Sequence, residues 1–307
     1  MNKAKVTMLI VSYNEKEYLP RAIESCMRQT YDNKEILVGD DGSNDGSIEY
    51  LEQFGAGIRY FVMSRDQNPA SIIPSFRVSN VIKRALDESE SEYFVSLSGD
   101  DYFTDPTMIE RAVNFLEENK DYCAYIHGMA YVSEEGKELS RRTLRCKPVT
   151  YWSGEYIHMS CFVFRKLSSK ELLNHLCDDT GLQYVLATKG KWKFDDRIVF
   201  SYFQRTQSIM HEADKFELSL LELLLLQDVQ NYGNHGTALR LATKSRFYYP
   251  VKYLVEHREL IKNEKYGKYI KALTDNNSDL ISQIEKGKYD RTMRLCRILF
   301  SLIRKIK

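Results

Sequence analysis

Residues 35–46 read Glu35-Ile36-Leu37-Val38-Gly39-Asp40-Asp41-Gly42-Ser43-Asn44-Asp45-Gly46. The first five residues form a short, mainly apolar run of the kind that predicts a buried strand. The seven that follow are a dense cluster of Asp, Gly, Ser and Asn, which is typical of a turn. The stretch therefore predicts a strand that ends where a pair of carboxylates begins.

Strand and helix patterns alternate on both sides of this stretch. Apolar runs predict strands at 6–11, 58–62 and 93–97, and helical patterns occur at 17–29, from about 47, and at 75–88. Since helices connect the successive strands, the crossovers should be right-handed and the strands mostly parallel. We therefore predict an α/β fold with a Rossmann-like, mixed and mostly parallel sheet flanked by helices.

The pattern becomes mixed after about residue 123. Strands are expected at 122–132 and 160–164 and a helix at 181–189, while Asp105-Pro106 predicts an N-cap and first helical turn. From Ala213 onward the chain is helical in pattern. We predict a domain over 1–212, with halves at 1–101 and 102–212, and a helical C-terminal extension over 213–307, which suits a chain of 307 residues.

Composition excludes several classes of protein. Lys plus Arg total 44 and Asp plus Glu total 43, so the net charge of +1 argues against a nucleic-acid partner. The six scattered cysteines contain no C-x-x-C pair, which favours reduced thiols in a cytoplasmic protein over a zinc site. We expect no signal peptide and no membrane-spanning segment. Dinucleotide-binding, P-loop and nucleophile-elbow motifs are absent from the sequence.

Three polar clusters follow predicted strands, at Ser12-Tyr13-Asn14-Glu15, Asp40-Asp41 and Asp100-Asp101. Ligands of open α/β sheets bind beyond the carboxyl ends of the strands. Paired carboxylates there suit Mg²⁺ or Mn²⁺, which can also hold a diphosphate, and Gly99 permits a close backbone approach. Each cluster alone could be an ordinary turn, but together they favour a nucleotide-diphosphate site.

These motifs make residues 6–101 resemble the nucleotide-sugar half of inverting family 2 glycosyltransferases, which have the GT-A fold. The run from Val6 to Glu15 is similar to the first strand and "TYNE" loop of that family, and Asp40 to Asp45 matches its "DDGSxD" signature. Ser98-Gly99-Asp100-Asp101 stands at the D-x-D position, with Ser98 in place of the first acid. The resemblance implies that Asp40 contacts the nucleobase and that Asp100 and Asp101 hold Mg²⁺ or Mn²⁺. The implied nucleotide-sugar contacts are Val11, Ser12, Tyr13, Glu15, Asp40, Asp41, Arg77 and Asp100, with Asn80 near Arg77.

The resemblance continues downstream to about residue 210. Asp178-Asp179 followed by Leu186-Ala187 and Gly190 tracks the family's "ED…LA..G" segment, which implies that Asp179 is the catalytic base. Asp196, in a second acidic pair, is the runner-up. His158 and Ser160 fall where acceptor contacts occur. The departures from the family pattern are Gln183, Val185 and Arg205, the last standing where the family has a histidine.

The resemblance implies an inverting, hexosyltransferase-type enzyme that moves a sugar from a nucleotide donor, with a bias to UDP, to a hydroxyl of a glycan or lipid-linked acceptor in cell-surface polysaccharide synthesis. The acceptor half is then 102–212. Two alternatives stay open: a sugar-nucleotide nucleotidyltransferase, and a non-catalytic, membrane-docked scaffold with a decayed donor site. The nucleotidyltransferase would need a Gly-rich basic loop after the first strand, which Ser12-Tyr13-Asn14-Glu15 is not.

The C-terminal extension contains two further candidate surfaces. Residues 289–307 form a basic amphipathic pattern, which suits an anionic membrane surface on the inner face of the plasma membrane or docking to the chain's own core or a partner subunit. The leucine-rich run 218–226 predicts core or a homo-oligomer interface. Upstream, the basic residues Arg141, Arg142, Arg145 and Lys147 predict a surface loop, with contact to a phosphorylated or lipid-linked acceptor as the alternative.

Overall fold

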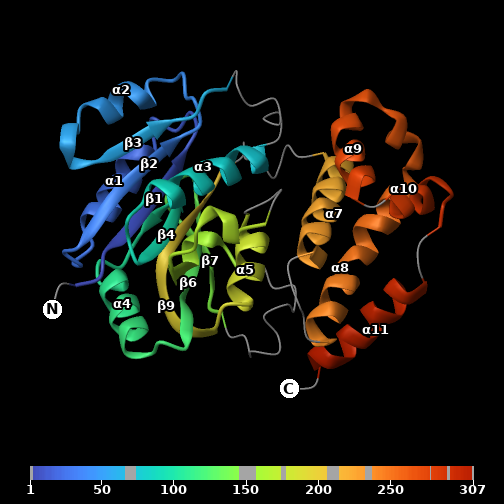
Figure 1. Cartoon of the computed structure of the whole chain (residues 1–307). Helices are drawn as coiled ribbons and strands as arrows, with labels where there is room; N and C mark the ends of the chain where they lie inside the picture. Colours follow the sequence, from blue (N-terminus) through green and yellow to red (C-terminus); the bar gives the residue numbers. More distant parts are fainter. Residues whose placement is uncertain are drawn as a thin grey trace. The chain divides into compact units, whose positions relative to one another are not determined.

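The computed structural model describes residues 3–65, 74–144, 157–173, 178–205, 214–231, 237–276, 278–288 and 291–305. The chain divides into two compact units (Figure 1). The first consists of Met1–Pro148, Tyr156–Leu172 and Cys177–Thr206, and the second mainly of Gln207–Lys307. The predicted domain boundary at 212 falls among residues 206–213, outside the described residues.

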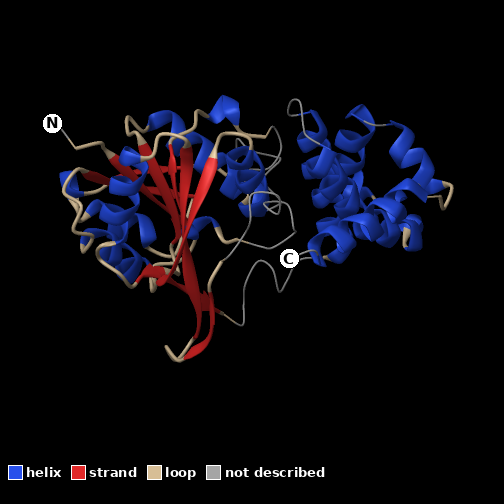
Figure 2. Ribbon diagram, turned by 90° about the horizontal axis from the view of Figure 1, so that it is seen from below, coloured by secondary structure: helices blue, strands red, loops and turns tan. Residues whose placement is uncertain are grey.

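Nine strands of the described chain form one mixed sheet in the first unit, with helices on both of its faces (Figure 2). The order is β3-β2-β1-β4-β8-β6-β9-β5, and β7 pairs with β6. Strands β1, β2, β3 and β4 are parallel neighbours, as are β6 and β9, whereas β5, β7 and β8 pair antiparallel. The predicted α/β fold with a mixed, mostly parallel sheet is therefore confirmed. The strands are β1 (Val6–Ser12), β2 (Lys34–Asp40), β3 (Arg59–Val62), β4 (Tyr93–Ser98), β5 (Tyr102–Phe103), β6 (Tyr122–Ser133), β7 (Glu138–Arg142), β8 (Phe162–Arg165) and β9 (Lys191–Gln204).

The helices of the first unit bury apolar stripes. In α1 the buried residues Leu19, Ala22, Ile23 and Cys26 follow the i, i+3, i+4, i+7 spacing of a helix that packs one face on a core. The free thiols of Cys26, Cys123 and Cys161 are all buried. The helical elements are α1 (Leu19–Met27), α2 (Ser47–Glu52), η1 (Gly55–Gly57), α3 (Pro74–Glu88), α4 (Met108–Glu118), η4 (Met159–Cys161), η5 (Ser169–Glu171) and α5 (Asp179–Ala187).

The strand register brings the predicted polar clusters to one edge. Ser12 lies beside Asp40 on the neighbouring strand, and Val11 lies beside Ser98. The end of β3 joins the same edge, where Met63 donates its N–H to the Asp40 carbonyl over 2.8 Å. The loops after β1, β2, β3 and β4 therefore meet, because parallel strands end on the same side of a sheet.

Two local predictions are wrong. Helix α4 begins at Met108 with Thr107 as its N-cap, and not at Asp105-Pro106. The Asp105 carboxylate accepts the N–H and hydroxyl of Thr107, each over 2.8 Å, so it closes a short side-chain turn before the helix. Arg141 and Arg142 lie in strand β7 and not in a loop, because their backbone pairs with β6, while Arg145 and Lys147 lie outside the described residues.

The second unit is helical. The leucine-rich run lies in α7, and Leu220, Leu221 and Leu223–Leu226 are buried there, so it forms core. Among the described residues, no helix is long and apolar enough to span a bilayer. The elements are α7 (Lys215–Asn231), α8 (Thr237–Glu256), η6 (Arg258–Lys262), η7 (Glu264–Tyr266), α9 (Gly267–Asn276), α10 (Ser278–Glu285) and α11 (Arg291–Lys305).

Candidate functional site

The loops after β1 and β2 lock together beside Tyr13. Asn14 has a positive φ of 52°, a left-handed conformation that Asn tolerates better than most residues. Its N–H donates to the Ser43 hydroxyl and its side-chain oxygen accepts the N–H of Asn44, each over 2.8 Å. The Tyr13 side chain is thereby held at the edge of the sheet with 38% of its surface exposed.

Asp40 supports this loop from within. Its two carboxylate oxygens accept the N–H and the hydroxyl of Ser43 over 2.7 and 2.6 Å, and the residue is fully buried. Burial raises the pKa of Asp40, while the bonds from Ser43 oppose that rise. The nucleobase contact implied for Asp40 stays a prediction. In this structure both oxygens of its carboxylate are hydrogen-bonded to Ser43.

Asp41 is hydrogen-bonded to two arginines that lie near the Tyr13 ring. Arg77, on α3, donates from Nε to the Asp41 carboxylate and from Nη2 to its carbonyl, the latter over 2.7 Å. Arg65 donates from Nε to the same carbonyl over 3.0 Å and lies 3.5 Å from the Tyr13 ring centroid. An exposed aromatic ring with two cations beside it suits a planar group that carries phosphates. The sequence analysis did not identify Arg65, because only the order of the strands in the sheet brings the end of β3 to this edge.

Glu15, Asp100 and Arg205 form a charged cluster after β1, β4 and β9. Arg205 donates from Nη2 to Glu15 over 2.9 Å and to Asp100 over 2.7 Å. Burial first, and then the negative charge of Asp100, raise the pKa of Glu15 to about 8, although Arg205 opposes the shift. Glu15 and Ser12 also contribute buried oxygens with no hydrogen-bond partner among the described residues.

A side chain at Gly99 has no room unless the Glu15 carboxylate moves. A Cβ atom built there would lie 2.4 Å from Oε2 of Glu15 and 3.2 Å from the Ser12 side chain. In this structure the neighbours of Gly99 are the chain's own side chains, and the close approach of its backbone to a bound ligand stays a prediction.

We expect Gly99→Ala to destabilise the fold by about 1–3 kcal/mol, because neighbouring atoms must move to admit the methyl group. Urea unfolding would measure the change. Gly57→Ala is the matched control, since no atom lies within 4 Å of its Cβ position. Equal stability of the two variants would show that the loop is not packed against Glu15 as described.

Asp101 lies behind this cluster. It is fully buried, and its Oδ1 accepts the N–H of Phe203 on β9 over 2.8 Å, whereas Oδ2 has no partner among the described residues. Burial and the neighbouring Asp100 raise the pKa of Asp101 well above its usual range. One oxygen thus fixes β9, and the other is left for a cation or a proton.

The acids at this edge fit a hard divalent cation. Three carboxylates, Glu15, Asp100 and Asp101, face one guanidinium, and two of their buried oxygens lack partners in the described part of the chain. Within the described residues no three His, Cys, Asp or Glu side chains form a ready-made metal site. Mg²⁺ is commonly bound by one or two carboxylates together with substrate phosphates, so two acids at this edge suffice for a site completed by its ligand.

Asp179 approaches the same region from α5, of which it is the first residue. Its Oδ1 accepts the N–H of Met159, and its Oδ2 has no hydrogen-bond partner among the described residues. The Tyr202 hydroxyl senses the charge of Asp179 and of the predicted metal ligands. Burial raises the pKa of Tyr202 to about 12, with further contributions from the charges of Asp101, Asp100 and Asp179. The charges of the predicted base and of the predicted metal ligands therefore all act on the Tyr202 hydroxyl.

His158 and Ser160 stand next to this tyrosine. The His158 ring lies 4.9 Å from the Tyr202 ring and 5.0 Å from that of Phe200, and its Nδ1 accepts the N–H of Ser160 over 3.2 Å. Both residues are buried. The arrangement leaves their predicted acceptor contacts untested.

The runner-up base lies in a different environment. Asp196 is an exposed residue within β9. The carboxylate of its neighbour Asp195 accepts the Tyr125 hydroxyl over 3.0 Å and lies 3.6 Å from Arg111 of α4. Behind it, the ring of the buried His127 lies 3.9 Å from Asp195. This second acidic pair is not brought together with Asp100 and Asp101.

His127 makes folding sensitive to acid. Burial lowers its pKa from 6.5 to about 3; Asp195 and Asp105 oppose the shift and Arg111 and Arg197 add to it. Since the unfolded chain binds the proton first, this contribution is complete above pH 6.5 and is lost as the pH falls from there toward 3. Between pH 6.5 and 4.5, we expect His127 to account for about 2 kcal/mol of lost stability.

Urea unfolding at several pH values tests this expectation. His127→Gln should flatten the decline by that amount, whereas the half-exposed His257, changed to Gln as a control, should leave it unchanged. An unaltered slope in His127→Gln would contradict a neutral, buried histidine.

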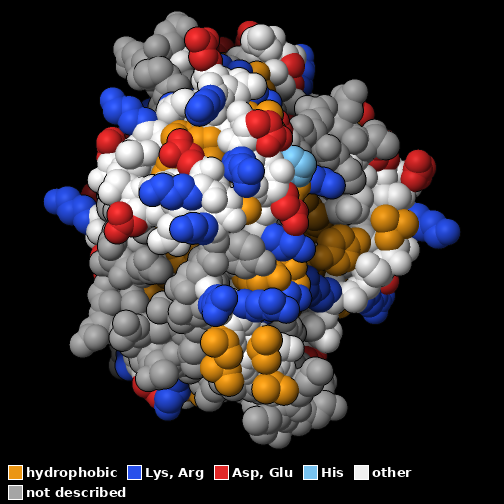
Figure 3. All heavy atoms as spheres, turned by 90° about the vertical axis from the view of Figure 1, so that its right-hand side faces the viewer, with side chains coloured by type: hydrophobic (Ala, Val, Ile, Leu, Met, Phe, Trp, Pro, Cys, Tyr) orange, Lys and Arg blue, Asp and Glu red, His pale blue; other side chains and the backbone are white. Residues whose placement is uncertain are grey.

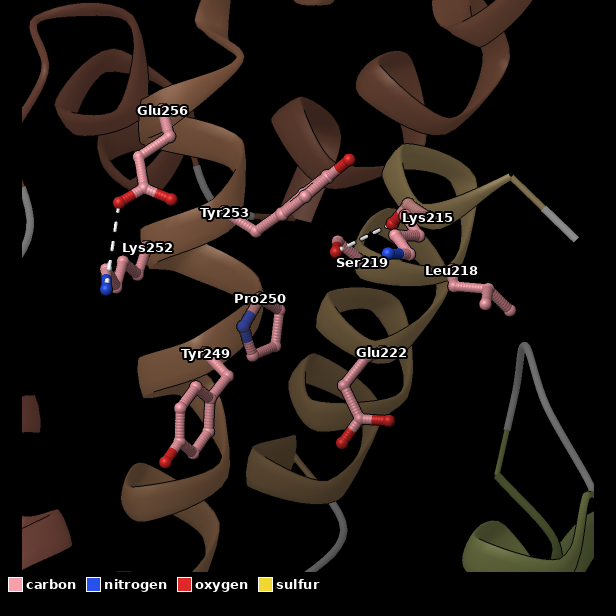
Figure 4. A pocket seen from close by; sticks show the side chains of 9 residues that line it. All are labelled: Lys215, Leu218, Ser219, Glu222, Tyr249, Pro250, Lys252, Tyr253 and Glu256. Atoms are coloured by element: carbon pink, nitrogen blue, oxygen red, sulfur yellow. Dashed lines mark hydrogen bonds and ion pairs between the residues drawn. The ribbon is translucent and has the colours of Figure 1, made fainter.

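A separate cavity of about 460 Å³ lies in the second unit, between α7 and α8 (Figure 4). Glu222 and Lys215 line it from α7, and Tyr249 and Tyr253 from α8. None of the acids at the edge of the sheet lines this cavity, so it is distinct from the candidate site. The lining residues are Lys215, Leu218, Ser219, Glu222, Tyr249, Pro250, Lys252, Tyr253 and Glu256.

The sequence was compared with protein families and with curated proteins. A family model described as glycosyl transferase family 2 matches residues 7–173. An uncharacterized glycosyltransferase of Rickettsia felis is 35% identical over 138 residues, which are 44% of this chain and 21% of that protein. One of Haemophilus influenzae is 28% identical over 143 residues, 45% of this chain and 52% of that protein. The chain thus spans at most about half the length of these relatives.

Solved structures resemble the fold over nearly the whole chain. Staphylococcus aureus TarS 1-349 in complex with UDP-GlcNAc has a TM-score of 0.62 at 14% identity, covering 96% of this chain and 89% of that one. The mannosyltransferase PcManGT from Pyrobaculum calidifontis, in complex with GDP-Man and Mn²⁺, has a TM-score of 0.51 at 11% identity, covering 99% and 89%. At these identities the likeness concerns the fold.

Proposed function

We propose that this chain, which belongs to glycosyl transferase family 2 and has the predicted GT-A fold, is an inverting hexosyltransferase that uses a nucleotide-diphosphate sugar, with UDP as the favoured nucleotide. The observation that carries the proposal is the convergence of three groups at one edge of the sheet. These are the Tyr13 ring with Arg65 and Arg77 beside it, the acids at Asp100 and Asp101, and the carboxylate of Asp179.

The donor lies with its base against the exposed Tyr13 ring. Arg65 and Arg77 lie 3.5 and 5.7 Å from the centre of that ring, so their charges are placed to meet the donor's phosphates. Val11, Ser12, Glu15 and Asp41 complete this side of the site, with Asp40 holding the loop through Ser43.

Asp179 acts as the general base toward the acceptor hydroxyl. Its first carboxylate oxygen accepts the N–H of Met159, and the second has no hydrogen-bond partner in the described part of the chain. The attacking oxygen forms its bond to the anomeric carbon as the bond to the diphosphate breaks on the opposite face, so the configuration inverts. Asp100 and Asp101 would hold Mg²⁺ or Mn²⁺, which when bound offsets charge on the leaving diphosphate.

We further propose that the acceptor is a glycan or lipid-linked hydroxyl in cell-surface polysaccharide synthesis, approached by His158 and Ser160. The Asp179 carboxylate, which bonds to Met159 beside them, supports this placement. The buried free thiols support a reducing, cytoplasmic location.

A donor screen tests the proposal. Purified protein with Mg²⁺ or Mn²⁺ is incubated with UDP-, GDP-, dTDP- and CMP-sugars, and nucleotide release is followed. We expect release from one UDP-sugar, and release that is about 10²–10⁴-fold slower once Asp179 is changed to Asn. Calorimetry of donor binding accompanies the screen, since it detects the bound donor without any acceptor. Metal-dependent binding without turnover in the presence of acceptors would favour the scaffold hypothesis, and no binding at all would overturn the proposal.

A further inference from the structure

Helix α11 leaves an aliphatic face uncovered. Leu295, Ile298, Leu299 and Leu302 are 58%, 51%, 46% and 53% exposed. Their i, i+3, i+4, i+7 spacing places them on one side of the helix. Large aliphatic side chains exposed together in this way are uncommon on a soluble surface and mark an interaction site.

Arg297 explains why this face points outward. It lies 4.6 and 4.4 Å from the ring centroids of Tyr248 and Tyr249 on α8, and it bonds to the Tyr249 hydroxyl. Residue 297 is roughly opposite the exposed face at 100° per residue, so its contact with α8 turns that face away. The aliphatic face is therefore a result of how α11 packs within its own unit.

The charge of the helix indicates what covers this face. The sequence of α11 contains Arg291, Arg294, Arg297, Arg304 and Lys305 and no acidic residue. Arg291 and Arg294 are exposed, and each lies one turn before an exposed aliphatic residue. A space-filling view shows such an arrangement, with hydrophobic side chains directly beside a row of Lys and Arg (Figure 3).

We propose that α11 docks this protein on an anionic lipid bilayer, with the four aliphatic side chains inserted at the headgroup boundary and the arginines on anionic headgroups. Interfacial helices combine an apolar face with a basic flank in this way. Each basic residue near such a surface strengthens binding by about fivefold. The proposal stands on the helical unit alone and does not depend on the reaction assigned to the first unit.

A second copy of the chain fits this face less well. It would bring the same arginines against Arg291 and Arg294, and like charges repel without an acidic partner on the helix. Four half-exposed side chains also fall well short of the roughly 800 Å² per partner that a standard interface buries.

Cosedimentation of the full chain with vesicles tests the proposal. Vesicles of phosphatidylcholine alone are compared with vesicles containing about one third phosphatidylglycerol. We expect at least tenfold stronger binding to the anionic vesicles and a marked loss at high salt. The double variant Leu299→Glu, Leu302→Glu should lose at least tenfold of this binding. Leu139→Glu, at a residue of β7 that is 56% exposed, is the matched control and should bind as wild type does.

A charge-reversal pair separates the contribution of the arginines from that of the aliphatic side chains. Arg291→Glu with Arg294→Glu should lose at least tenfold, whereas Lys262→Glu with Lys271→Glu, exposed elsewhere in the unit, should change binding far less. Circular dichroism verifies that each variant is folded, and Leu295→Gln with Ile298→Gln is a milder second test of the same face. Equal binding to neutral vesicles, no binding to either, or conversion of a dimer to a monomer by Leu299→Glu in ultracentrifugation would overturn the proposal.

Discussion

Asp179→Asn is expected to lower turnover by about 10²–10⁴-fold while leaving donor affinity within about twofold of wild type. The amide oxygen of Asn can still accept the N–H of Met159, so the start of α5 should be preserved. What is lost is the basic oxygen that removes the acceptor proton. Steady-state rates and calorimetric donor affinities, measured on the same preparation, separate these two effects.

Asp196→Asn is the control for this experiment. Asp196 is an exposed residue of β9, and its charge is not among those that raise the pKa of Tyr202, so we expect nearly unchanged turnover. If Asp179→Asn kept its activity and Asp196→Asn lost it, the base would be Asp196. Reduced donor affinity in Asp179→Asn would instead assign that residue to the donor pocket.

Most of the fold could be predicted from the sequence because apolar runs and turn clusters alternate sharply. The strand at 93–97 and the turn after it, for example, correspond closely to β4 and the acids that follow. The start of α4 was misplaced because an Asp before a Pro has the composition of an N-cap. Here the Asp105 carboxylate closes a side-chain turn two residues earlier, and the Pro106 carbonyl accepts the N–H of Thr30. The bond from Thr30 fixes the backbone before the helix, and Thr30 is too far away in the sequence for the local pattern around Asp105 to reveal it.

The site was predictable in outline and not in its contacts. The positions of three polar clusters after strands were sufficient to expect them at one edge. The different partners of Asp40 and Asp41 were not predictable, since Asp40 ends strand β2 and Asp41 begins the loop that follows. Asp40 faces Ser43 and Asp41 faces Arg77. Arg205 bonds to Glu15 across 190 residues of sequence, and only the position of β9 in the sheet makes that pair possible.

The second large effect is expected at Asp100, where Asp100→Asn should lower metal-supported turnover by about 10²–10³-fold. Asp100 is the less buried of the two acids, and its carboxylate is shared with Arg205 over 2.7 Å. The amide removes one negative charge from the cluster, so a divalent cation loses a carboxylate ligand. The ion pair between Arg205 and Glu15 is retained. Titration of Mn²⁺ followed by electron paramagnetic resonance measures the metal directly, alongside the rate.

The controls for Asp100 show whether a metal ion or the Arg205 guanidinium neutralises the charge of the diphosphate. Asp105→Asn alters a nearby aspartate that is paired with Arg111 over 2.9 Å, and it should change neither Mn²⁺ affinity nor turnover. Arg205→Gln should tighten Mn²⁺ binding, because the guanidinium no longer competes for the Asp100 carboxylate. Turnover that survives complete removal of divalent ions and disappears in Arg205→Gln would contradict the metal site. It would leave Arg205 as the cation that stabilises the leaving group, since a charge held between Glu15 and Asp100 already stands where a divalent ion would be needed.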